Sequence, residues 1–160
     1  MIYNKDMYNY LKQITTPYEI NMPSDNNNLR ILRGKNCSGE HFFYLEHNCC
    51  SVSSKTIINY TGKDLTQLEW DCNEIYINDS EAKIPLLQTG LFTVNSIKTI
   101  LETKYSSQAF DVVMSFDEGE EFCVLPSVTI RFYAVRNNST FIPHGKLEEF
   151  NQPVLIESVN

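Results

Sequence analysis

Cysteine and histidine side chains gather between residues 37 and 50, and these residue types are common zinc ligands. The cluster consists of Cys37, His41, His47, Cys49 and Cys50. Zinc sites often take their ligands from close pairs such as Cys-x2–4-Cys, and this spacing matches no such knuckle or finger. On an extended strand, His41 and His47 would stand roughly 20 Å apart, at about 3.3 Å per residue. We therefore expect no metal here, and we interpret the cluster as strand-end histidines and small buried thiols.

Four carboxylates surround a single glycine in the segment DEGEE, residues 117–121. The segment separates two apolar runs, AFDVVMSF and FCVL, which indicates the turn of a hairpin. Three interpretations are open: a solvated turn that opposes aggregation, an anionic patch for a basic partner, and a calcium loop without the regular oxygen spacing of an EF-hand. Our hypothesis is partner binding, and it assigns the contact to Asp117, Glu118, Glu120 and Glu121.

Signatures of catalysis are sparse. The chain holds no Gly-x-Ser-x-Gly elbow, no Gly-x-Gly-x-x-Gly or P-loop segment, and no His-Glu-x-x-His. His144, in the segment FIPHG, is expected at the surface of a turn rather than as a catalytic base. We therefore predict no enzymatic activity, no catalytic residue and no cofactor. An enzyme of another family, with a Cys–His or carboxylate site, is the alternative.

The single tryptophan, Trp70, lies in the acidic segment of residues 68–78, LEWDCNEIYIN. If this segment is a strand, Glu69 and Asp71 point away from the face that carries Trp70, and the tryptophan belongs to the core. If residues 63–74 form a helix instead, Trp70 is available as an interface anchor, since tryptophan is enriched at binding hot spots. We favour the strand and the core position.

Two amphipathic helices are expected. Apolar residues between Tyr3 and Ile14 recur at the spacing of one helical face, and Pro17 ends the segment. The second helix spans Val94–Tyr105, with Thr93 as its N-cap. Lys104 falls in its last turn, where a cation complements the helix dipole.

Strands are expected wherever short apolar or alternating runs lie between turn residues. The first two of these runs are joined by GKNCSG and form a hairpin, and the short connections elsewhere favour antiparallel pairing. We predict an α+β fold, a single domain over residues 1–160 with a mainly antiparallel sheet and the two helices packed on one face. The expected strands are Leu29–Arg33, His41–Glu46, Lys55–Tyr60, Leu68–Asn78, Ala109–Phe116, Glu121–Leu125, Ser127–Val135 and Pro153–Ser158, with a weak turn at Lys146–Phe150.

The composition is that of a folded, acidic protein. Its 160 residues include 13 Lys and Arg against 20 Asp and Glu, which gives a formal net charge of −7 and a pI near 4.9. A net anion is repelled by the phosphates of bare DNA or RNA. No apolar stretch is long enough for a membrane span or a signal peptide. Five cysteines, an odd number, then predict a reduced protein in the cytoplasm.

Taken together, the chain resembles the small acidic immunity proteins that bacteria make beside a toxin, including those of contact-dependent growth inhibition systems. The resemblance is one of type, a lone acidic α+β domain rich in Asn and Tyr, and it carries over no individual residue. It implies that the chain binds a cognate toxin domain, often a basic nuclease, and blocks its active site or substrate surface. An accessory subunit of a phage or secretion assembly is a further alternative.

Overall fold

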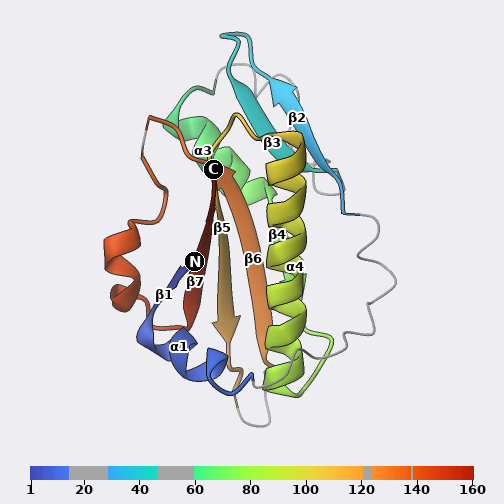
Figure 1. The fold of residues 1–160 in the computed structure, drawn as a ribbon, viewed down its shortest axis with the longest axis vertical. Helices are drawn as coiled ribbons and strands as arrows, with labels where there is room; N and C mark the ends of the chain where they lie inside the picture. Colours follow the sequence, from blue (N-terminus) through green and yellow to red (C-terminus); the bar gives the residue numbers. More distant parts are fainter. Residues whose placement is uncertain (15–28, 47–59, 121–123, 138) are drawn as a thin grey trace.

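The computed structural model describes residues 1–14, 29–46, 60–120, 124–137 and 139–160, which form a five-stranded sheet and a separate two-stranded hairpin (Figure 1). The sheet has the order β1-β7-β5-β6-β4, and all its pairings are antiparallel. The predicted α+β fold is therefore confirmed. The strands are β1 (Ile2–Tyr3), β2 (Ile31–Lys35), β3 (His41–Leu45), β4 (Glu74–Ile77), β5 (Phe110–Asp117), β6 (Ser127–Ala134) and β7 (Val154–Val159). The helices are α1 (Lys5–Leu11), α3 (Lys63–Cys72), α4 (Lys83–Lys104) and the 3-10 helix η3 (His144–Glu149).

The main core lies between the sheet and α4, which runs along one face of it (Figure 1). Alternation along β5 sends Phe110, Val112, Met114 and Phe116 to this face, where all four are buried. Gly90 permits the close approach of helix and sheet. A Cβ atom there would lie 2.8 Å from Met114 Sδ and 2.9 Å from Val128 Cγ1.

The opposite face of the sheet has a smaller core of its own. Val113, Tyr133 and Ile156 point to this side and are covered by Ile142 and by Leu147 of η3. Both expected helices, α1 and α4, contribute to the main core on one face, as predicted, and η3 covers the second face in addition. The segment that follows β6 folds back over the second face because the alternating apolar residues of β5, β6 and β7 leave an apolar surface there.

Helix α4 begins well before the expected N-cap at Thr93. Thr93 is 2% exposed inside the helix, and its hydroxyl donates to the carbonyl of Thr89 at 2.9 Å. Pro85 is tolerated because it lies in the first turn, where backbone N–H groups have no partner within the helix. The predicted C-terminus is confirmed, since the helix ends at Lys104 with Tyr105 as its C-cap.

The segment expected to be one strand, Leu68–Asn78, is a helix followed by a strand. Its first half belongs to α3 and its second half is β4. The helical face was hidden because one of its buried positions is occupied by a carboxylate, Glu69, which interrupts the apolar pattern.

The remaining expectations have mixed outcomes. The hairpin of β2 and β3 is confirmed, as are β5, β6 and β7, and the weak turn at residues 146–150 forms most of η3. The first helix begins after Asn4, whose Oδ1 accepts from the amide of Met7 at 3.0 Å, and Tyr3 lies in β1 instead. Most of Lys55–Tyr60 and three of the five residues of Glu121–Leu125 lie outside the described residues; within the second, Val124 forms only an isolated bridge. Among the described helices, none is long and apolar enough to cross a membrane.

Candidate functional site

Exposed carboxylates gather at the end of the sheet where α4 begins (Figure 1, lower end). The register explains why: Ile77 of β4 and Phe116 of β5 both pair with Val128 of β6, from opposite sides. The loop after β4 and the turn after β5 therefore leave the sheet together. We call this region the acidic end; its described, exposed carboxylates are Asp79, Glu81, Asp117, Glu118 and Glu120.

Glu118 is held by an internal ion pair. Its Oε2 lies 2.7 Å from Nζ of Lys83, in the first turn of α4. Hydrogen bonds from Lys83 and from the Tyr10 hydroxyl lower the pKa of Glu118, and the same carboxylate raises the pKa of Lys83. Glu118, one of the predicted contact residues, therefore also connects the turn to α4 and α1.

Asp117 and Glu120 shape the turn itself. Oδ1 of Asp117 accepts from the amide of Gly119 at 2.9 Å. Glu120 and Val124 exchange backbone hydrogen bonds of 3.0 and 3.2 Å. No described residue forms an ion pair or side-chain hydrogen bond with the carboxylate of Glu120. Glu121, the fourth predicted contact residue, lies outside the described part of the chain.

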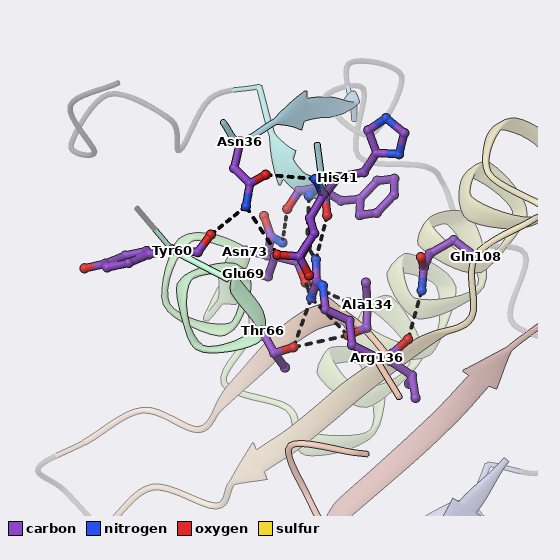
Figure 2. A network of polar contacts seen from close by, with 12 residues as sticks. Asn36, His41, Tyr60, Thr66, Glu69, Asn73, Gln108, Ala134 and Arg136 are labelled. Atoms are coloured by element: carbon purple, nitrogen blue, oxygen red, sulfur yellow. Dashed lines mark hydrogen bonds and ion pairs between the residues drawn. The ribbon is translucent and has the colours of Figure 1, made fainter. Parts of the chain in front are cut away.

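A buried polar network that the sequence patterns did not predict surrounds Glu69. Glu69 was expected on a solvent face, and this was wrong, because its residue is only 1% exposed. Arg136 binds its two carboxylate oxygens with two nitrogens, at 2.6 and 2.8 Å (Figure 2). The same oxygens accept from the backbone amides of Phe43 at 2.9 Å and Ala134 at 2.8 Å.

Asn73, one turn further along α3, extends this network to both sheets. Its side chain accepts from the amide of Leu45 at 3.0 Å and donates to the carbonyls of Phe43 at 2.8 Å and Phe132 at 3.2 Å. Burial raises the pKa of Glu69, while the guanidinium of Arg136 opposes that rise. The side chains of Glu69 and Asn73 thus supply backbone groups of β3 and of the end of β6 with hydrogen bonds that a neighbouring strand would otherwise provide. We interpret the network as structural. A helical reading of residues 63–74 would have placed Glu69 and Asn73 on one face.

A cavity of about 440 Å³, lined mostly by residues of polar type, opens beside the first turn of α3. The guanidinium of Arg136 lies on its wall, but it is already used by Glu69, by the Thr66 hydroxyl and by two backbone carbonyls. Lys63 and Asp64 offset each other on the same wall. The described lining therefore has no excess charge to select a charged ligand; it comprises Gly62, Lys63, Asp64, Thr66, Gln67, Arg136, Asn137, Ser139, Thr140 and Phe141.

A second buried carboxylate, Asp111, lies under the segment that covers the smaller core. Its Oδ2 lies 2.8 Å from Nε2 of His144 and accepts from the Tyr133 hydroxyl at 2.9 Å, while Oδ1 accepts from the Ser158 hydroxyl at 2.8 Å. Burial raises the pKa of Tyr133. His144 was expected as a surface residue, but its side chain is only 36% exposed. Because three donors converge on one carboxylate, we interpret the cluster as the anchor of η3 on the sheet.

Trp70 is partly buried and packs against the smaller core, so the core position that we favoured holds only in part, and the residue lies in a helix instead of a strand. Its ring stacks on Phe141 with 4.8 Å between centroids and lies 6.0 Å from the ring of Tyr133. The guanidinium of Arg131 lies over the same ring, 4.9 Å from its centroid. Trp70 therefore covers part of the smaller core and is not a fully exposed anchor.

The described residues include two members of the cysteine and histidine cluster. Cys37 lies in the turn between β2 and β3, and His41 begins β3 with an exposed side chain. His47, Cys49 and Cys50 lie outside the described residues. Within the described ranges, no three His, Cys, Asp or Glu side chains are grouped to hold a metal ion.

Comparisons with known proteins provide one assignment. No curated protein and no solved structure matches the chain. A family model matches residues 2–160, almost the whole chain. The chain therefore belongs to the Uncharacterized protein PM0498 family.

Proposed function

We propose that this protein is an immunity protein, which binds a basic bacterial toxin domain in the cytoplasm and blocks its active site or substrate surface. The observation that carries the proposal is the acidic end. Asp79, Glu81 and Glu120 expose carboxylates there that no described residue pairs by side-chain contact, and the same end carries the exposed apolar residues Val124 and Leu125. Exposed carboxylates together with exposed apolar side chains are a composition suited to binding a basic protein.

The electrostatic argument starts from the target. A nuclease must attract phosphate, so its active site lies in a positive surface. An inhibitor with a net charge of −7 is attracted to that surface and is steered to it at long range. The inhibitor and the nucleic acid then bind to overlapping sites on the toxin, so the bound inhibitor excludes the nucleic acid.

The first experiment tests whether inhibition exists. The C-terminal domain of a large secreted protein encoded beside this gene is expressed in cells with and without the chain, and survival is counted. The purified pair is then analysed for a stable complex. We expect protection and a complex of fixed stoichiometry. Toxin-expressing cells that die in the presence of the chain, or that survive equally without it, would rule out the immunity function.

A second experiment tests the acidic end. We expect the Asp79→Lys, Glu120→Lys double variant to associate about tenfold more slowly at low salt, with a smaller loss at high salt, because exposed charges act mainly on the association rate. The control is Glu102→Lys, Glu149→Lys, which changes the net charge equally at exposed positions outside the acidic end. Equal association rates for the two variants would remove the acidic end from the interface.

A further inference from the structure

Two neighbouring aliphatic side chains are exposed within the acidic end. Val124 is 51% exposed and Leu125 is 50% exposed, although the next residue, Pro126, is buried. Both follow the acidic turn and precede β6, so they stand beside Asp117 and Glu120. A pair of aliphatic residues that remains in water loses the free energy that burial would provide.

The backbone holds this pair in a fixed place. The bridge between Glu120 and Val124 holds the acidic turn to the residues that follow it, with hydrogen bonds of 3.0 and 3.2 Å. Gly119 has a φ of +73°, and a Cβ atom on it would lie 2.2 Å from the carbonyl oxygen of Val124 and 2.9 Å from the carbonyl carbon of Leu125. The acidic turn therefore needs glycine at position 119. The amide of Gly119 is in turn capped by Asp117.

We propose that Val124 and Leu125 are the apolar anchor of the interface, and that they insert into an apolar recess in the basic cleft of the toxin domain. This inference rests on the proposed function. The partner chemistry follows from charge complementarity: an anchor that lies beside the exposed carboxylates of Asp117 and Glu120 fits a recess whose rim is basic. A few well-buried residues near the centre of an interface commonly provide most of the binding energy, while the residues around them exclude water.

The fixed backbone adds to the argument. A backbone that is already held in place loses little conformational entropy on association. The carboxylates and the anchor should also act on different rate constants, since exposed charges change association, whereas buried contacts change dissociation. The two contributions can therefore be separated in one kinetic experiment.

The test measures association and dissociation rates between the purified chain and the toxin domain encoded beside its gene. We expect Val124→Ser and Leu125→Ser each to bind at least about tenfold more weakly, through faster dissociation, with the association rate nearly unchanged. The control is Ile2→Ser, an exposed aliphatic position on β1, at the other edge of the sheet from β4. We expect it to bind like the wild type.

A second variant tests the backbone shape of the acidic turn without changing its charge or the apolar side chains of Val124 and Leu125. We expect Gly119→Ala to weaken binding as well, again through dissociation, with the fold of each variant checked by its thermal melt. Wild-type rates for both serine variants, beside a wild-type protein that binds and protects, would overturn the anchor and leave the proposed function standing. A wild-type chain that neither binds nor protects would overturn both.

Discussion

Glu69 is a carboxylate that has been taken almost entirely out of water, and every contact that it makes compensates for this. Arg136 supplies two charge-assisted hydrogen bonds, and the amides of Phe43 and Ala134 supply two more. A buried ion pair of this kind adds little net stability compared with apolar residues, because both ions lose their hydration. The ion pair does make this arrangement specific, since removal of one partner leaves the charge of the other buried without a counter-ion.

This asymmetry gives a prediction for single and double variants. We expect Glu69→Gln to lower the free energy of unfolding by about 3–5 kcal/mol, because Arg136 keeps a buried charge without its counter-ion. The double variant Glu69→Gln, Arg136→Met should lose less than the sum of the two single variants. Urea denaturation measures all three. The control is Glu46→Gln, which breaks an exposed pair with Arg30 and should cost under about 1 kcal/mol. Additive losses would contradict the coupling.

Glu118 gives a prediction for pH. Hydrogen bonds from Lys83 and Tyr10 hold its pKa in the folded protein below the ordinary value of 4.5. The folded state therefore binds its proton less readily than the unfolded state, and the stabilisation is present above that value and is lost as the pH falls through the lowered pKa. We expect Glu118→Gln to be less stable than the wild type at neutral pH, by under about 1 kcal/mol since the pair is half exposed.

The measurement is the difference in unfolding free energy between the two proteins, from neutral pH to well below 4.5. The difference should close as the wild-type carboxylate takes up its proton. Glu120→Gln is the matched control, because the structure describes no side-chain partner for Glu120, and it should match the wild type throughout. A difference that stays constant with pH would mean that Glu118 acts without its charge.

At the scale of elements, α4 provides the larger part of the core facing the sheet. Its buried residues include Leu86, Leu87, Val94, Ile97 and Leu101, all at 2% exposure or less. Its C-terminal end and its basic last residue were readable from the sequence, whereas its N-terminal half was not. That half forms because the sheet offers an apolar face to it, and tertiary packing outweighs the weak helix propensity of Gly90 and the neighbouring threonines.

The packing of α4 can be tested at its C-terminal end. We expect Leu101→Ala to lower the free energy of unfolding by about 2–5 kcal/mol, because the fully buried side chain leaves a cavity against the sheet. The neighbouring Glu102→Ala, on the exposed side of the same turn, should change it by under about 0.5 kcal/mol. Denaturant melts compare the two. A loss below about 0.5 kcal/mol for Leu101→Ala would show that this face of α4 is not in the core.

At the scale of the whole molecule, the order of the sheet links the two ends of the described chain. β7, the last strand, lies between β1 and β5, so the first and last elements pair with each other (Figure 1). The sheet is therefore complete only when the C-terminal strand has joined it. The acidic end lies where the β5–β6 turn and the start of α4 meet, and its carboxylates come from two separate loops. Their combination is a property of the assembled sheet.

Local pattern in the sequence was enough for the hairpin of β2 and β3 and for β5, β6 and β7, because alternation over a few residues decides which side of a strand is buried. The acidic turn at residues 117–121 was equally visible. The tertiary structure decided the rest. The partners Glu69 and Arg136 are 67 residues apart, and Lys83 and Glu118 are 35 apart. Only the path of the folded chain brings such pairs together, so it alone determines which carboxylates are neutralised and which remain for a partner.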